Sequence, residues 1–271
     1  GVSGDIYFSK AGGVAETRHV FLPGVGAPEF WRKSARVRIG ELIEGLDNKG
    51  IFTPPSLRGA LHYPGVAGGS NWGSLAFDSD RQIAVLPQNR VVSVNRLIRR
   101  EQYAGMARQD LRGLGLSLNE GTPYLLSSEV LLSPLGVPCI KPPWGVLMAV
   151  DLRSGKKLWE IPFGSTRDMV PGLSALPFGL NFGLPHGGGP ITTASGVVFI
   201  GASLDNYLRA YDISSGDELW RARLPAGGQA TPMTYRLTEQ GRQFVVIAAG
   251  GHANMRTKLG DSLVAFALPD G

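Results

Sequence analysis

The sequence predicts an all-β fold built from repeated four-stranded units, and three observations lead to that prediction. A ten-residue segment occurs twice, as VDLRSGKKLW at Val150–Trp159 and as YDISSGDELW at Tyr211–Trp220. The segments around both copies are short apolar runs rich in β-branched residues, which favour strands. The chain also contains 38 glycines and 19 prolines among 271 residues, which indicates many turns and few long helices.

The repeated segment itself predicts a β-hairpin. In both copies an aspartate opens the segment, and a Ser-Gly pair separates it from a Leu-Trp pair in the same register. Such a Ser-Gly pair favours a tight turn, because glycine readily adopts the positive φ that the turn requires. Asp151 therefore corresponds to Asp212, and Gly155 corresponds to Gly216.

Further strands are predicted around the two hairpins. They fall at Gly196–Leu204, Gln243–Gly251 and Ser262–Pro269, with an earlier strand pair at Asn71–Leu86. The unit is therefore roughly sixty residues long, and repetition of such sheets around an axis is a β-propeller. Three to four such blades fit in this chain, so either the chain oligomerises or it forms the C-terminal part of a larger propeller.

The tryptophan of each repeat is predicted to pack between blades rather than to bind a ligand. Trp159 and Trp220 follow their turns at the same distance. A large flat side chain fits between neighbouring sheets, and its indole N–H can donate to a backbone carbonyl. The first 70 residues and Asn95–Trp144 do not repeat, and we expect long irregular loops there.

Composition and spacing exclude several classes of protein. The formal charge of +5 is spread along the chain, and the densest basic segment, Asn95–Gly113, lacks aromatic residues spaced for stacking on bases, so nucleic acid is not expected as a partner. The single cysteine, Cys139, excludes an intramolecular disulfide framework. The chain has no 18-residue apolar run, no closely spaced histidines and no phosphate-binding loop. The segment His186–Pro190 imitates a hydrolase oxyanion segment, but the G-x-S-x-G elbow that a hydrolase requires is missing.

Longer stretches of the chain resemble a known family. They are GIFTPPSLRGALHYPG, LLSPLGVPCIKPPWG, AGGHANMRTKLGDSLVAFALP and the run from GGGPITTAS to RLPAGGQATPMTY. These stretches are similar to the C-terminal portion of the membrane-bound quinoprotein dehydrogenases of the glucose and quinate/shikimate type. The resemblance places the C-terminal blades of the propeller at residues 50–271, whereas residues 1–49 match poorly.

The resemblance implies an activity, a cofactor and partners. It implies an eight-bladed propeller with pyrroloquinoline quinone on its axis and a Ca²⁺ or Mg²⁺ ion that polarises the quinone. It further implies an enzyme that oxidises an alcohol group of a sugar or cyclic polyol and passes the electrons to membrane ubiquinone. The expected location is the periplasmic face of the bacterial inner membrane, and the expected partner is the remaining N-terminal part of the propeller.

Three cofactor-binding residues are expected from the resemblance. Asp205 in SLDNYLRAY and His252 in AGGHANMRTKLGD occupy positions that lie near cofactor and substrate in the family. Both follow strands at matching places in successive repeats, which favours one shared pocket. An asparagine that contacts the quinone in the family aligns with Pro87, so either the local register shifts and Asn89 takes its role, or this contact is missing.

No catalytic base and no metal ligand is assigned. In the family these residues precede the matched part, and residues 1–49 contain no counterpart with the surrounding pattern. The alternative is therefore a non-catalytic β-propeller that serves as a binding scaffold without the quinone. The two alternatives differ in whether the protein takes up pyrroloquinoline quinone.

Overall fold

The fold is described from a computed structural model, which covers residues 3–7, 17–21, 43–50, 52–132, 138–168 and 181–268. Most of the poorly matched segment at residues 1–49 therefore lies outside the described residues. The chain divides into two compact units. Unit 1 combines residues 1–66 with residues 91–142, and unit 2 combines residues 67–90 with residues 143–271.

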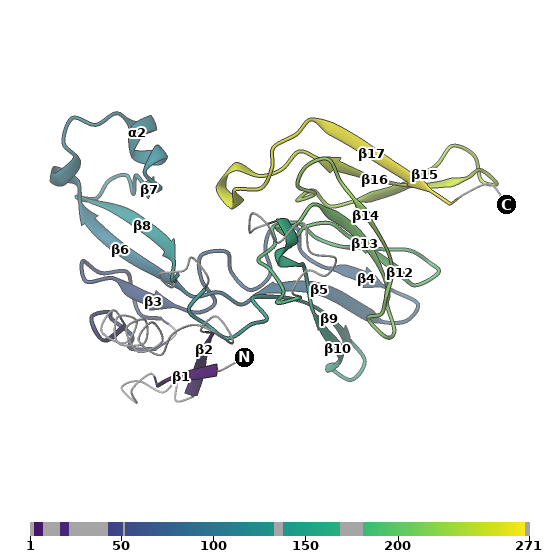
Figure 1. Cartoon of the computed structure of the whole chain (residues 1–271), viewed down its shortest axis with the longest axis horizontal. Coiled ribbons are helices and arrows are strands. Elements are labelled where there is room, and N and C mark those ends of the chain that lie inside the picture. Colours follow the sequence, from purple (N-terminus) through teal and green to yellow (C-terminus); the bar gives the residue numbers. More distant parts are fainter. Residues whose placement is uncertain are drawn as a thin grey trace. The chain divides into compact units, whose positions relative to one another are not determined.

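Unit 2 consists of three antiparallel sheets that follow one another along the chain (Figure 1). Sheet I contains β4 (Ala76–Asp78), β5 (Ile83–Asn89), β9 (Gly145–Asp151) and β10 (Lys156–Pro162). Sheet II contains β11 (Ile191–Thr192), β12 (Val197–Ile200), β13 (Tyr207–Asp212) and β14 (Glu218–Arg223). Sheet III contains β15 (Met233–Arg236), β16 (Gln243–Ala249) and β17 (Ser262–Ala267). Two short 3₁₀ helices, η2 (Thr166–Asp168) and η4 (Ala253–Met255), complete the unit. The predicted all-β blades are thus confirmed.

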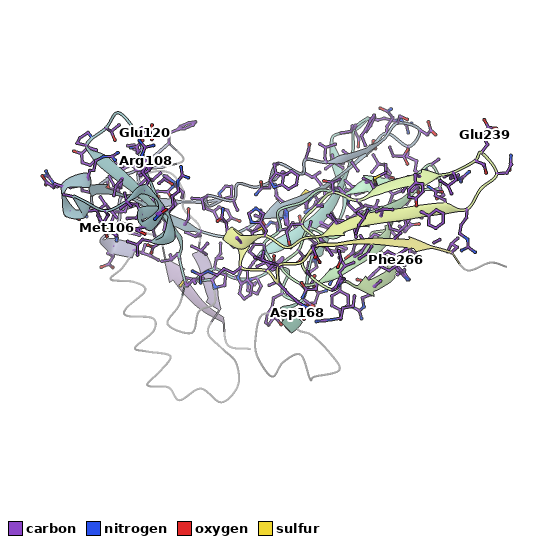
Figure 2. All side chains as sticks on the ribbon, turned by 90° about the horizontal axis from the view of Figure 1, so that it is seen from above. Met106, Arg108, Glu120, Asp168, Glu239 and Phe266 are labelled. Carbon is purple, nitrogen blue, oxygen red and sulfur yellow. The ribbon has the colours of Figure 1, made fainter. Side chains whose placement is uncertain are left out.

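Unit 1 contains a fourth large sheet in the order β3-β6-β8-β7. The elements of unit 1 are β1 (Ser3–Tyr7), β2 (Thr17–Phe21), β3 (Ala60–His62), β6 (Ser93–Arg99), η1 (Arg100–Tyr103), α2 (Arg108–Gly113), β7 (Leu116–Ser117) and β8 (Tyr124–Val130). Strands β1 and β2 pair with each other in a separate two-stranded sheet. The segment at residues 91–142 interrupts sheet I between β5 and β9, which pair directly with each other. Arg108 and Glu120, labelled in Figure 2, form an exposed ion pair of 2.8 Å in this segment.

The inserted segment is more regular than the sequence suggested. We expected an irregular loop at Asn95–Trp144, because no repeat occurs there. Instead β6 and β8 pair along their whole length, and Leu111, Leu116 and Leu125 form a small buried core beside them. These three leucines are far apart in sequence and come from a helix and two strands, so their burial could not be read from a single periodic pattern.

The repeated segment forms the predicted hairpins. Gly155 and Gly216 adopt positive φ values of 68° and 78° at equivalent places in their turns. Asp212 Oδ1 accepts hydrogen bonds from the backbone N–H groups of Ser214 and Ser215, and Asp151 Oδ1 accepts one from Arg153. The aspartate of the repeat therefore closes the turn, which accounts for its conservation between the two copies.

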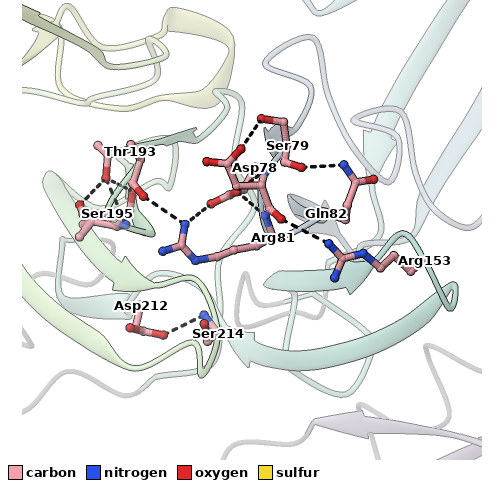
Figure 3. Close-up of polar contacts among 12 residues, drawn as sticks. Asp78, Ser79, Arg81, Gln82, Arg153, Thr193, Ser195, Asp212 and Ser214 are labelled. Carbon is pink, nitrogen blue, oxygen red and sulfur yellow. Dashed lines mark hydrogen bonds and ion pairs between the residues drawn. The ribbon is translucent and has the colours of Figure 1, made fainter.

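Arginine side chains join the turns of sheets I and II at this end of unit 2 (Figure 3). Arg81 donates to Asp78 Oδ2 at 2.9 Å and to the carbonyl of Ala194 at 3.1 Å. Arg153 donates to the carbonyl of Asp80 at 3.3 Å. The backbone N–H and the guanidinium of Arg81 hold the pKa of Asp78 below its usual value. These turns lie at one end of the strands, and Asn89 and Asp205 lie at the other end.

Trp159 joins sheet I to sheet II as predicted. Its indole N–H donates to the carbonyl of Ile213 at 2.8 Å, and the side chain is only 9% exposed. The ring lies against Gly216, where an added Cβ would come within 2.7 Å of it. Trp220 contacts sheet III through an edge-on contact with Phe266 at 5.0 Å, but it remains 38% exposed. Sheet III contributes three strands among the described residues, so no fourth strand covers this tryptophan.

Two apolar cores hold the sheets face to face. The larger contains side chains from sheets I and II, including Val85, Leu147, Phe163 and Ile200. The smaller joins sheets II and III through residues such as Leu208 and Ile247. Among the described residues, no helix is both long enough and apolar enough to span a bilayer.

Candidate functional site

The three predicted cofactor residues lie at corresponding ends of three successive sheets. Asn89 ends β5, which is the second strand of sheet I. Asp205 lies in the turn between β12 and β13, after the second strand of sheet II. His252 follows β16, the middle strand of sheet III, and precedes η4. The chain thus presents one polar residue at the same end of each sheet.

Asn89 is buried and is bound to backbone groups. Its Nδ2 donates to the carbonyl of His186 at 3.1 Å, and its Oδ1 accepts from the N–H of the same residue at 2.9 Å. The backbone N–H of Asn89 donates to Gly69 at 2.6 Å. This pairing fixes the segment around His186 to the end of β5.

His186 is fully buried, and neither ring nitrogen has a hydrogen-bond partner of good geometry among the described side chains and backbone. Burial lowers the pKa of this imidazole to about 4, and the neighbouring backbone of Gln88 offsets only part of that effect. His186 also forms an isolated β-bridge with Ser203, which connects it to the turn that carries Asp205. The ring is therefore neutral at pH 7.

A line of hydrogen bonds continues from Ser203 to His252. Gln229 donates from Nε2 to the carbonyl of Ser203 at 2.7 Å, and its Oε1 accepts from the hydroxyl of Thr257 at 3.0 Å. The same hydroxyl accepts from the backbone N–H of His252 at 2.8 Å. Buried polar networks of this kind are rigid when their members are paired. The loops of sheets II and III are thereby fixed to each other.

Asp205 is fully buried and its carboxylate is paired on both oxygens. Oδ1 accepts from Arg209 Nη1 at 2.9 Å, and Oδ2 accepts from Arg209 Nη2 at 2.5 Å. Oδ2 also accepts from the backbone N–H and the hydroxyl of Ser165, at 2.7 and 3.0 Å. Burial acts to lower the pKa of the Arg209 guanidinium, but the hydrogen bonds and charge of Asp205 outweigh it, so that pKa lies above its usual value.

Asp168 adds a second connection between the same two loops. This residue, labelled in Figure 2, ends η2. Its Oδ2 accepts from the backbone N–H of Asn206 at 3.0 Å, and its Oδ1 accepts from Arg223 Nη2 at 2.6 Å. In the loop after β10, Asp168 therefore accepts hydrogen bonds from residues of sheet II and its turn, whereas Ser165 donates hydrogen bonds to Asp205.

Several buried polar atoms of this region lack a hydrogen-bond partner among the described residues. They are Nδ1 of His252, both ring nitrogens of His186, the hydroxyl of Ser203 and Oδ1 of Asn206. Buried polar atoms without partners in a native protein call for a specific explanation such as a missing ligand or water. Of the three predicted residues, His252 therefore has a free side-chain atom, whereas the side chains of Asn89 and Asp205 already have protein partners. The unpaired Nδ1 of His252 leaves one hydrogen-bonding position for a polar ligand.

The glycines of His186–Pro190 have a packing role in this structure. A Cβ on Gly188 would lie 2.3 Å from the carbonyl of Gln229, and one on Gly189 would lie 1.8 Å from the carbonyl of Gly73. Both clashes are with backbone, which cannot give way as a side chain can. The glycines therefore allow backbone segments of unit 2 to approach each other closely.

Several residues of this network were not identified from the sequence. Ser165, Arg209, Gln229 and Thr257 become neighbours of the predicted residues only through the pairing of strands and sheets. One signal was present for Gln229, which follows a Gly-Gly pair in a segment that resembles Gly187–Ser195.

The described residues contain no group of three or more His, Cys, Asp or Glu side chains that could hold a metal ion.

Comparison with known families places this geometry in context. The model of the PQQ family, described as the glucose/ethanol/alcohol dehydrogenase beta-propeller domain, matches residues 24–245. Quinoprotein glucose dehydrogenase of Escherichia coli (strain K12) is 44% identical over 227 residues, which cover 82% of this chain and 28% of that protein. Quinoprotein glucose dehydrogenase A of Acinetobacter calcoaceticus is 46% identical over 226 residues, with 83% and 28% covered.

Other relatives extend the comparison to different substrates. Quinate/shikimate dehydrogenase (quinone) of Acinetobacter baylyi is 38% identical over 250 residues, which cover 90% of this chain and 30% of that protein. Among solved structures, quinohemoprotein alcohol dehydrogenase from Comamonas testosteroni is 20% identical with a TM-score of 0.49, covering 98% of this chain and 37% of that one. The chain thus spans less than a third of the length of these curated relatives.

Proposed function

The chain belongs to the PQQ family of glucose/ethanol/alcohol dehydrogenase β-propeller domains, and we propose that it forms part of a quinone-dependent enzyme that oxidises an alcohol group of a sugar or cyclic polyol. The observation that carries this proposal is the position of His252. It lies at the same end of unit 2 as Asn89 and Asp205, and its Nδ1 is buried without a partner among the described residues. The relatives that act on glucose or quinate support the substrate class.

Within this proposal the residues have different tasks. Pyrroloquinoline quinone, when bound, would supply the group that accepts a hydride, and with it two electrons, from the alcohol carbon. His252 offers its imidazole to the quinone or to the substrate as a hydrogen-bonding group. Asp205 and Asn89 hold the turns that surround the site, because their polar atoms already pair with Arg209, Ser165 and the backbone of His186.

We also propose that the remaining part of the propeller is the partner of sheet III. Sheets I and II each have four strands, whereas sheet III has three among the described residues, and β17 lies at its edge. Leu263 on β17 is 75% exposed, and Trp220 beneath this sheet is half-buried. An exposed apolar edge strand is a site for strand addition. A strand from the remaining propeller would extend the face of sheet III that contacts Trp220 through Phe266, and further chain packed on the opposite face would cover Leu263.

The remaining expectations complete the proposal. The catalytic base and the ligands of a Ca²⁺ or Mg²⁺ ion would come from the remaining part of the propeller, because none is assigned in this chain. Electrons would pass to ubiquinone, and the propeller would lie on the periplasmic face of the inner membrane. These expectations rest on the family resemblance alone.

An oxidation assay with the complete natural polypeptide tests the proposed activity. The apoprotein is loaded with pyrroloquinoline quinone and Ca²⁺ or Mg²⁺, and oxidation of glucose, quinate, shikimate and glycerol is followed with a ubiquinone analogue as acceptor. The proposal predicts quinone-dependent turnover of at least one of these alcohols. A folded protein that binds no quinone and oxidises none of them would instead support a non-catalytic propeller scaffold.

A further inference from the structure

The ion pair between Arg209 and Asp205 is the least exposed in the part of the chain that the structure describes. The side chain of Arg209 is 4% exposed and that of Asp205 is 0% exposed. A buried carboxylate is costly unless its charge is paired, so this aspartate depends on its arginine. Asp205 lies in the turn between β12 and β13, and Arg209 lies inside β13.

The geometry of the pair fixes the orientation of the carboxylate. The two terminal nitrogens of Arg209 contact different oxygens of Asp205, so the guanidinium acts as a planar fork. Arg209 is itself held from other sides. Its guanidinium carbon lies 5.9 Å from the centre of the Phe163 ring and 5.2 Å from that of Tyr207, and its Nε lies 3.5 Å from Glu218. The carboxylate therefore has little freedom to rotate.

The same carboxylate joins two sheets. Ser165, in the loop that leaves sheet I, donates its N–H and its hydroxyl to Asp205. Gly164 packs so closely on this turn that an added Cβ would lie 1.9 Å from the hydroxyl of Ser203. Loss of the Arg209 fork would leave Asp205 as an unpaired buried charge, and both loops would shift.

We infer that Arg209 is a positioning residue for the quinone site and that it acts through Asp205. This inference rests on the proposed function, since it assumes that the turn at residues 201–206 borders the quinone. Arg209 reaches no ligand in this account. It sets the orientation of Asp205, and Asp205 sets the position of the loops from sheets I and II.

Quinone binding by the complete polypeptide tests the inference. In Arg209→Gln, the dissociation constant of pyrroloquinoline quinone should rise at least tenfold, and the absorption spectrum of the bound quinone should shift. Arg221→Gln is the matched control, because the Arg221 side chain is 59% exposed and pairs with Glu218 on its own strand rather than with Asp205. Its dissociation constant should stay within twofold of the wild type. If Arg209→Gln does not fold, Arg209→Lys is used and should show a smaller loss of at least threefold.

A double variant separates positioning from a purely structural role. If Arg209 acts through Asp205, the Asp205→Asn/Arg209→Gln protein should bind quinone no more weakly than Asp205→Asn alone. The double variant should also melt at a higher temperature than Asp205→Asn, because it buries no charge without a partner. Losses of affinity that multiply in the double variant would overturn the inference. So would an Arg209→Gln protein with a lower melting temperature but unchanged quinone affinity. A wild-type protein that binds no quinone would overturn the proposed function as well, whereas normal wild-type binding with an unaffected Arg209 variant would overturn this inference alone.

Discussion

At the scale of single residues, the candidate site contains polar groups of two kinds. Asn89 and Asp205 have their side-chain atoms paired with protein groups, and they hold turns in place. His252 has a buried Nδ1 without a partner among the described residues, so of the three predicted residues it is the one with a side-chain atom left for a ligand. The difference matters for mutagenesis, because changing a paired residue alters the fold as well as the site.

The first prediction concerns His252. In the complete polypeptide, His252→Ala should raise KM for the alcohol or change the preference among sugars, while the melting temperature stays close to that of the wild type. The physical reason is that its Nδ1 has no partner in the described protein, so little structure depends on it. Asn254→Ala, on exposed η4, is the control and should leave the kinetics unchanged. Unchanged kinetics of the His252 variant across several sugars would remove this residue from the site.

The second prediction concerns the buried His186 and acid stability. Its pKa is about 4 in the folded protein, against an ordinary value of 6.5. Between these values the unfolded chain binds the proton and the folded chain does not, so stability decreases as the pH falls from 6.5 towards 4. Over the whole interval, the contribution of this one group to the free energy of unfolding amounts to at most about 3 kcal/mol.

Chemical denaturation at pH 7 and pH 4.5 measures this effect, with His186→Phe as the reference because phenylalanine keeps an aromatic ring and cannot titrate. Other groups titrate in both proteins and cancel in the comparison. We expect the wild type to lose more stability than the variant between the two pH values. Equal losses would show that His186 is not held neutral in the folded state.

At the scale of the structural elements, the repeated hairpin explains how sheets I and II are joined. The tryptophan of one sheet packs against the glycine in the hairpin turn of the next sheet, as Trp159 does against Gly216. The equivalent glycine of sheet I, Gly155, has nothing within 4 Å of an added Cβ. The two positions therefore share one backbone conformation and differ only in their surroundings.

This difference gives the third prediction. Gly155→Ala should reduce the free energy of unfolding by about 1–2 kcal/mol, because alanine is disfavoured at positive φ. Gly216→Ala should reduce the free energy of unfolding by about 1–3 kcal/mol more than Gly155→Ala does, because the added Cβ would also displace the ring of Trp159. Urea denaturation of the two variants compares them directly. Equal losses would mean that the tryptophan contact does not hold the sheets together.

Sequence reasoning succeeded where a pattern is local and repeated. The hairpins at Val150–Trp159 and Tyr211–Trp220 were predicted because turn chemistry and strand alternation occur within ten residues. The corresponding ends of the second strands, which carry Asp205 and His252, follow from the same register. The sheet within residues 91–142 was not predicted, because its strands pair across long separations and have no copy elsewhere.

The partners of the site residues were beyond reach for a related reason. Arg209 is four residues from Asp205, and in a strand that spacing alone does not indicate contact. The contact arises because the β12–β13 turn folds the carboxylate back onto β13. Gln229 and Thr257 approach His252 only after sheets II and III have packed. Such contacts depend on tertiary structure, which a single sequence does not specify locally.

At the scale of the whole molecule, sheet III leaves an exposed edge in unit 2. Its outer strand β17 carries Leu263, which is 75% exposed. The chain spans less than a third of the length of its curated relatives. The remaining part of the propeller is the cover that we propose for this edge.

The fourth prediction follows from this edge. In the complete polypeptide, Leu263→Asp should lower the free energy of unfolding by about 2–4 kcal/mol, because a charge would be buried without a partner between this face of sheet III and the chain packed on it. Leu237→Asp is the matched control, since Leu237 is 81% exposed in the hairpin after β15 and away from the edge. Its effect should be below about 0.5 kcal/mol. Equal and small effects of both substitutions would show that no further chain packs on the face of β17 that carries Leu263.

The central claim is that unit 2 provides part of a site for pyrroloquinoline quinone, and the amount of quinone bound tests it most directly. The complete polypeptide is purified without quinone and titrated with it in the presence of Ca²⁺ or Mg²⁺, with binding followed by absorbance and intact mass. We expect one quinone per polypeptide, and weaker binding in Arg209→Gln than in Arg221→Gln. A folded polypeptide that binds no quinone under these conditions would contradict it.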